Sequence, residues 1–202
     1  MKHPSIRELF DYWNIRRGRR TAPGRDDIDP GDIRTALADT FIVAFDETAG
    51  HPFRIAGTRV SALFGHDLKH EPFLNLWTPE SRLLMSDLIS VIGYESVGLM
   101  AGVTARTHAG TSLDLELLVL PLVHDGRTDA RLLGALAPAG APAWIGVSAL
   151  GDLALGTFRY VGAEDAPNFL RANPRRDGRL RHGLVVYDGG LANAESLPPH
   201  AG

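Results

Sequence analysis

The order of periodic segments in this 202-residue sequence predicts an α+β domain, a five-stranded antiparallel sheet with helices on one face. Two short apolar runs near the front of the chain and three alternating runs behind residue 98 supply the strands. Helical patterns precede and separate these two groups. We expect residues 1–38 to form an N-terminal helical extension, residues 39–162 the sheet domain, and residues 163–202 an arginine- and proline-rich tail.

The chain opens with a predicted helix. Ser5 and Glu8 have the spacing of a capping box, which is typical of a helix start. Apolar residues then follow at i, i+3, i+4 and i+7, and this stripe consists of Ile6, Leu9, Phe10 and Trp13. The stripe must be buried either on the chain's own sheet or on a second copy, and Trp and Phe are typical anchors of an interface.

The next segments predict a helix and a pair of strands. Asp29 followed by Pro30 is typical of a helix start, with Ile33, Ala36 and Leu37 expected to face inward. Residues 41–45 and 53–56 are short runs rich in strand formers, separated by a polar turn.

Two more helices and the back of the sheet follow. A short helix begins near Thr58 and ends at Gly65, and Thr78 followed by Pro79 starts a longer one that runs to about residue 94. Its expected inner face consists of Leu84, Leu88, Val91 and Ile92. The period then changes to two over 99–106, 113–119 and 132–136, which predicts a meander, and residues 144–161 are also strand-like.

Composition excludes several classes of protein. Hydrophobic residues make up 44% and charged residues 22% of the chain, which favours a globular core. No stretch approaches the roughly 18 apolar residues of a membrane span, and the charged N-terminus lacks the apolar segment of a secretory signal. Cysteine is absent, which excludes disulfides, thiolate metal sites and a cysteine nucleophile. We expect a cytoplasmic protein.

Charge is spread unevenly around a net value of −3. Residues 1–25 carry a net +5, residues 26–164 a net −9, and residues 165–202 a net +1 with five arginines close together. Two basic arms therefore flank an acidic body. We favour arms that fold back onto that body or are solvated over contact with nucleic acid, because an acidic body repels phosphate and no aromatic residues alternate with the arginines.

The segment 53–77, FRIAGTRVSALFGHDLKHEPFLNLW, resembles PAS domains, in which a Gly-Thr pair and a Phe-Gly-x-x-Leu run follow the second strand. Trp13, Arg16 and Arg17, followed by DIDPGDI over 27–33, are similar to single-domain PAS proteins of alphaproteobacteria. The resemblance covers roughly residues 8–137. One departure is that the family usually has a glycine where this chain has Lys69-His70-Glu71.

The resemblance implies a stand-alone sensory or regulatory module rather than an enzyme, acting by binding another protein in motility or cell-cycle signalling. It implies that the N-terminal stripe forms a homodimer seam, because relatives often dimerise through this helix. It also implies a space for a small ligand between the sheet and the short helices. Its expected lining, which equally well fills a core, consists of Ile55, Leu63, Phe64, Phe73, Leu76, Trp77, Val103, Leu115 and Leu117. Arg54, Arg59 or Arg106 would meet a ligand carboxylate at the rim, although surface ion pairing is the simpler interpretation.

Other chemistry has weak support. His66 and His70 are spaced i, i+4, but a metal needs a third ligand, so no metal site is expected. A LOV-type flavin adduct is excluded by the lack of cysteine, and the predicted helix up to residue 94, where haem-binding PAS domains place their ligand, contains no histidine. The cofactor is therefore left unknown. Asp114 and Glu116 are expected on a solvated face, so no catalytic residue is predicted.

The alternatives to a PAS regulator are a small α+β enzyme and a nucleic-acid-associated regulator that uses the basic arms. A polar dyad in a pocket would favour the enzyme, and a steep salt dependence of binding would favour the nucleic-acid protein. Neither alternative has a sequence motif in its support.

Overall fold

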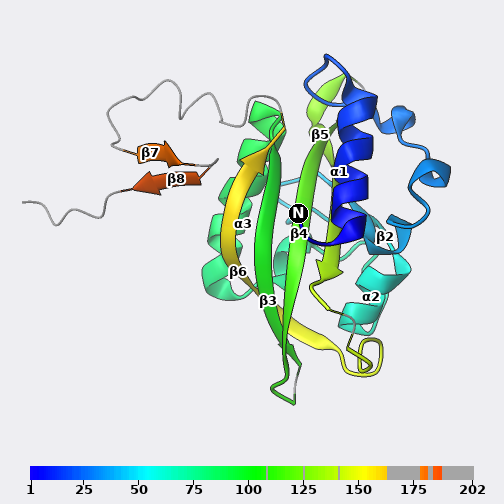
Figure 1. Ribbon diagram of the computed structural model, residues 1–202, viewed down its shortest axis with the longest axis vertical. Helices are drawn as coiled ribbons and strands as arrows, with labels where there is room; N and C mark the ends of the chain where they lie inside the picture. The colour runs from blue at the N-terminus through cyan, green and yellow to red at the C-terminus, as the bar shows by residue number, and fades with distance from the viewer. Residues whose placement is uncertain (108, 125, 141, 163–177, 182–183, 188–202) are drawn as a thin grey trace, which may run out of the picture.

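A computed structural model describes most of the chain, namely residues 1–107, 109–124, 126–140, 142–162, 178–181 and 184–187. Its body is one antiparallel sheet with strand order β2-β1-β5-β4-β3-β6 and packing elements on both faces (Figure 1). The strands are β1 (Thr40–Ala44), β2 (Phe53–Ala56), β3 (Gly98–Thr107), β4 (Ser112–His124), β5 (Arg127–Pro138) and β6 (Leu150–Val161). The α+β prediction is confirmed.

The sheet has six strands, so the prediction of five is wrong by one. The strand-like stretch ahead of residue 161 forms β6, which pairs with β3 from Thr107↔Leu150 to Gly98↔Val161. This pairing extends the sheet beyond β3 along its full length. A separate two-stranded antiparallel sheet joins β7 (Gly178–Arg181) and β8 (Leu184–Tyr187); the rest of the tail lies outside the described residues.

The inner face of the sheet carries the larger core. Three elements cover it: α2 (Thr58–Phe64), the 3-10 helix η4 (Phe73–Leu76) and α3 (Pro79–Glu95). As expected, α3 begins at a Thr78 cap, whose Oγ1 accepts a hydrogen bond from the Ser81 amide at 3.3 Å. Its buried face includes Met85, Leu88, Ile89 and Ile92, whereas Leu84 is 43% exposed. The predicted face of this helix is therefore rotated slightly from the observed one.

The outer face is covered by the N-terminal part of the chain. Helix α1 (Pro4–Arg17) lies over β4 and β5 (Figure 1). It is followed by a linker, residues 18–39, that contains three short 3-10 helices, η1 (Arg25–Asp27), η2 (Pro30–Ile33) and η3 (Leu37–Asp39). Together they enclose a second core with the outward side chains of the sheet. The first 38 residues thus bury part of the outer face of the sheet.

The expected helix starts are only partly found. Pro4 opens α1, so the cap is His3, whose Nδ1 accepts from the Ser5 amide at 3.3 Å; the predicted Ser5–Glu8 capping box is wrong. Asp29 does cap Pro30, but the helix is a single 3-10 turn. Ile33 and Ala36 are buried as predicted, whereas Leu37 is 42% exposed.

Candidate functional site

Most of the predicted ligand-pocket residues gather on the inner face of the sheet. Eight of the nine lie in the inner core: Leu63, Phe64, Phe73, Leu76, Trp77, Val103, Leu115 and Leu117. Each of them is at most 7% exposed. Phe73 packs its ring against Phe41 and Trp77 with ring centroids 5.6 and 5.7 Å away. At these positions the side chains pack against one another as a core.

Ile55 is the exception, and the prediction that it lines the inner face is wrong. It is 51% exposed and pairs across the sheet with Ile42, which belongs to the outer core. The register of β1 and β2 shifts between Ile42 and Val43, so that Val43 pairs with Phe53 rather than Arg54. This bulge places Phe53 on the inner face and Ile55 on the outer face, although both would share one face in a regular strand.

The predicted dimer seam is covered by the chain itself. Ile6, Leu9 and Trp13 are fully buried against the outer face, and the Trp13 indole donates a hydrogen bond to the Pro121 carbonyl at 2.9 Å. In this chain the three side chains are covered by its own sheet, which is one of the two surfaces that the stripe was expected to meet. Phe10 is only half-buried, stacking on Trp13 with ring centroids 6.3 Å apart. The spacing of the apolar residues on α1 predicts that they are buried, but it does not identify the surface that covers them.

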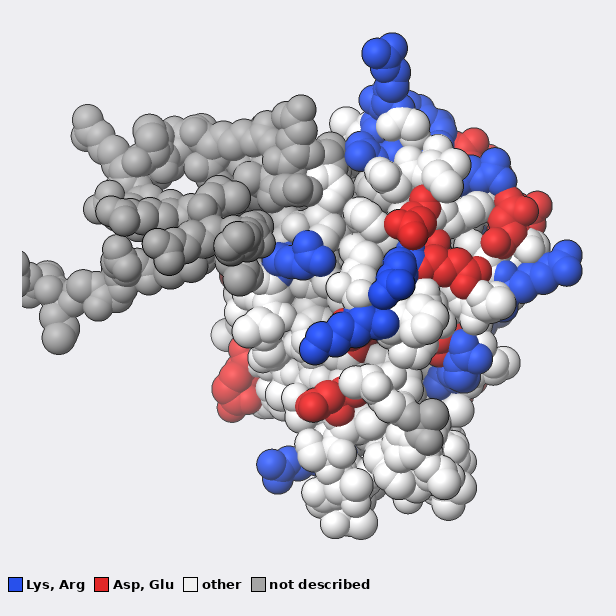
Figure 2. Space-filling view, viewed as in Figure 1, with Lys and Arg blue, Asp and Glu red and all other residues white. Residues whose placement is uncertain are grey.

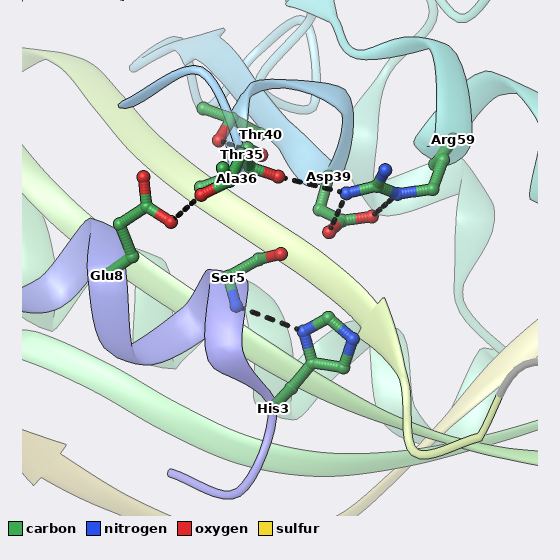
Figure 3. A network of polar contacts seen from close by, with 8 residues as sticks. All are labelled: His3, Ser5, Glu8, Thr35, Ala36, Asp39, Thr40 and Arg59. Carbon is green, nitrogen blue, oxygen red and sulfur yellow. Dashed lines mark hydrogen bonds and ion pairs between the residues drawn. The ribbon is translucent and has the colours of Figure 1, made fainter. Parts of the chain in front are cut away.

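A polar network joins the outer linker to the inner helices (Figure 3). Arg59, at the start of α2, donates from Nε and Nη2 to the two carboxylate oxygens of Asp39, both at 2.6 Å. The same Nη2 donates to the Thr35 carbonyl at 3.2 Å, and the Thr35 hydroxyl donates to Glu8 on α1. Asp39 is fully buried, and its hydrogen bonds raise the pKa of Arg59. The network holds α1, the linker and α2 together, and sequence analysis had assigned Arg59 to a ligand or a surface pair.

Gly57 explains the Gly-Thr pair of the resemblance. A Cβ atom on Gly57 would lie 2.5 Å from the Leu37 carbonyl oxygen and 2.3 Å from that of Ala38. The Gly57 amide also donates to the Thr40 carbonyl at 2.8 Å. Only glycine lets the linker pass this close to the start of α2.

The histidine pair does not form a chelate on a helix. His66 lies beyond the C-terminal end of α2, where its Nε2 contacts Glu71 at 2.8 Å, and this bond raises its pKa. His70 has a φ of 72°, a backbone conformation that favours glycine, in the segment where the family usually has one. Among the described residues no group of three potential metal ligands comes together.

The strand acids have structural partners. Asp114 accepts a hydrogen bond from the Thr104 hydroxyl at 3.0 Å. Glu116 accepts from the backbone amides of Lys2 and His3, at 2.9 and 2.7 Å, and so fixes the start of the chain beside β4. A periodicity argument cannot find the role of Glu116, because its partners lie more than 110 residues away.

A buried histidine was missed by sequence analysis. His51 is fully buried with a φ of 59°, and its Nδ1 accepts from the Asp46 amide at 3.2 Å. Burial lowers the pKa of His51. Its ring packs on Phe45 in the turn region between β1 and β2, so the imidazole acts as part of the fold there.

The basic N-terminal arm folds back onto acids of its own linker. Arg16 pairs with Asp32, and Arg20 pairs with Asp27 at 2.8 Å. Figure 2 shows acidic and basic side chains interspersed around this end of the outer face. This supports the simpler interpretation of the first arm, whereas the arginines of the second lie in the tail, where no side chain is described.

Two hollows open on the outer face. The first, the linker groove, has a volume of about 480 Å³ and lies between the linker and the β1–β2 edge. The second, the sheet hollow, has a volume of about 600 Å³ and lies over β3, β4 and β6, beside the start of the chain. It is lined by residues that include Met100, Gly102, Thr104, Gly156, Thr157 and Phe158. Of the eight inner-core residues, Val103 and Leu115 contribute to the lining of the sheet hollow, and the other six line neither hollow.

Comparisons with known structures give only distant similarity. A PAS domain from Colwellia psychrerythraea is 16% identical, with a TM-score of 0.39, over 55% of this chain and 97% of that one. A Rhodobacter sphaeroides LOV protein is 14% identical, with a TM-score of 0.38, over 57% of this chain and 71% of that one. The PAS domain of an HTR-like protein from Haloarcula marismortui is 14% identical, with a TM-score of 0.36, over 54% and 90%.

No protein with a curated description matches this chain. None of the described helices combines the length and the apolar character needed to span a membrane. A family model described as PAS domain matches residues 1–137, which include α1, the linker, strands β1 to β4 and all but the last residue of β5. PAS domains are typically sensory or signalling modules. Because this match covers more than half of the sequence, the chain belongs to the PAS domain family.

Proposed function

We propose that this PAS module is a bacterial regulator that works through protein–protein contacts and forms a homodimer through the sheet hollow. The observation that carries the proposal is that α1 lies mainly over the central strands β4 and β5 of the outer face, whereas the sheet hollow lies over β3, β4 and β6. The hollow over β3 and β6 has two glycines in its lining, so a second surface can approach the backbone there. The dimer seam is thus moved from the α1 stripe to the neighbouring strands.

The packing of the inner face favours contacts over a ligand at the expected place. The eight predicted pocket positions are packed as a core, so ligand binding there would require the core to open. Apolar side chains are exposed elsewhere, Leu83 at 75% on α3 among them. A role in motility or cell-cycle control, in alphaproteobacteria and in the cytoplasm, rests on the resemblance of the Trp13 and DIDPGDI segments and on the absence of cysteine.

The test is sedimentation equilibrium of the full chain and of two matched variants. Thr157→Arg places a charged side chain in the sheet hollow at an exposed position. Thr111→Arg makes the same change at an exposed site next to the β3–β4 turn, outside the hollow. We expect the parent and Thr111→Arg to be dimers and Thr157→Arg to dissociate at least tenfold more readily, because an unpaired charge is costly in an interface. A monomeric parent chain, or equal dimerisation of both variants, would contradict the proposal.

A further inference from the structure

The linker groove is a site distinct from the expected PAS ligand pocket, because none of the eight inner-core pocket residues lines it, although Phe41 of the inner core does. Its floor includes Ile42 and Ile55 of the β1–β2 pair, and its opposite wall includes Ile33 and Leu37 of the linker. Ile55 thus shares the groove with linker residues that lie about twenty positions earlier in the sequence. Its volume of about 480 Å³ is within the range of roughly 300–1,000 Å³ that is usual for small-molecule sites.

The apolar lining of the groove is incompletely covered. Ile55 is 51% exposed and Leu37 is 42% exposed, although both are large aliphatic side chains in contact with the same hollow. Covering this surface would gain free energy through the hydrophobic effect. A ligand with an apolar body fits this surface.

The polar part of the site is cationic. Arg25 and Arg34, both on the linker, line the groove. Among the described residues neither guanidinium has a hydrogen-bond or ion-pair partner, whereas those of Arg16, Arg20 and Arg59 are each paired with an aspartate. Two guanidinium groups without a counter-charge beside an apolar surface are complementary to a carboxylate.

We propose that the linker groove binds a small carboxylic acid with an apolar body, its carboxylate held by Arg25 and Arg34 and its apolar part against Ile55 and Leu37. The site lies on the part of the outer face opposite to the sheet hollow in strand order, with β1 and β2 at one edge and β6 at the other. The proposal therefore stands whether or not the chain dimerises. It assigns the linker a binding role in addition to its role in joining α1 to β1.

The test uses octanoate as the probe and octanol as its uncharged analogue, titrated into the full chain with labelled isoleucine and leucine methyl groups. We expect saturable shifts at the Ile55 and Leu37 methyls, and octanol to bind about tenfold more weakly than octanoate. Arg25→Gln combined with Arg34→Gln should weaken octanoate about tenfold or more and leave octanol unchanged. The matched control is Arg54→Gln, an exposed arginine on β2 that does not line the groove and that should not change either affinity.

Four results would overturn the assignment. The first is equal affinity for octanoate and octanol, and the second is an equal loss of octanoate binding in Arg54→Gln. The third is shifts that saturate at inner-core methyls such as those of Leu63 and Leu117, which would place the ligand on the other face. The fourth is Ile55 shifts that follow protein concentration without any probe, which would show that the groove is occupied by a second copy of the chain.

Discussion

On the inner face of the sheet, α2, η4 and α3 close over the strands and leave the predicted pocket residues packed against one another. On the outer face, α1 and the linker also bury a core, but they leave two hollows, one on each side of α1. Both faces are apolar in sequence, and they differ in how completely one chain covers them. Both hollows are thus on the outer face, which the N-terminal segment covers only in part.

The difference arises from what each covering element can fill. On the inner face, Phe73 of η4 packs its ring against Phe41 and Phe53 of the strands, at centroid distances of 5.6 and 5.8 Å. The outer linker is made of short 3-10 turns, which pack a few side chains such as Ile33 and leave others such as Leu37 outside. A helix covers a pair of strands continuously, whereas a linker made of single turns leaves gaps between the linker and the strands.

The first prediction tests whether both faces are true cores. Leu117 and Leu118 are neighbours on β4, both fully buried, and they point to the inner and the outer core, respectively. We expect Leu117→Ala and Leu118→Ala each to lower the free energy of unfolding by about 2 to 5 kcal/mol, the usual cost of such a cavity. Urea denaturation followed by circular dichroism measures both.

Each of the two variants is the control for the other, because both replace a leucine of β4 with alanine. If α1 left the sheet readily in solution, Leu118 would be partly solvated in the folded state. Leu118→Ala would then cost less than about 1 kcal/mol while Leu117→Ala kept its full effect. That result would contradict the outer core and return the α1 stripe to consideration as a surface for a second copy.

The fold was largely predictable, because strand and helix periods are local. A few consecutive residues are enough to recognise the start of α3 at Thr78-Pro79 and the alternation of the meander strands. The face of Ile55 was not predictable, because one extra residue in β2 reverses the alternation and depends on pairing with β1. The α1 stripe shows the same limit, since its spacing predicts burial but not the partner.

The candidate sites were less predictable than the fold, because they are assembled from distant segments. Arg25 and Arg34 become part of a candidate site only because the folded linker lies beside Ile55. Arg59 was considered as a rim residue, and its real partner, Asp39, lies twenty residues earlier. Neither relation has a spacing that a single sequence reveals.

The second prediction tests the joint between the two faces. Arg59→Gln removes the charge partner of the fully buried Asp39 and should lower the free energy of unfolding by about 1 to 3 kcal/mol, below the value for a wholly buried pair because Arg59 is half-exposed. Arg16→Gln is the matched control, because Arg16 and its partner Asp32 are both exposed, and it should lower the free energy of unfolding by clearly less than Arg59→Gln does. Equal effects in urea denaturation would show that the network contributes no more than a surface ion pair.

The third prediction, which has the smallest expected effect, compares one tryptophan on each face of the sheet. Trp13 and Trp77 are both fully buried, but only the Trp13 indole N–H has a described acceptor, the Pro121 carbonyl; no hydrogen-bond partner for the Trp77 indole N–H lies among the described residues. Trp13→Phe loses a hydrogen bond as well as volume, whereas Trp77→Phe loses volume and removes an unsatisfied donor. We therefore expect Trp13→Phe to cost about 1 kcal/mol more in urea denaturation followed by circular dichroism. If Trp77→Phe is the costlier change, the inner indole has a partner that only solution reveals, and the inner face is less dry than its packing indicates.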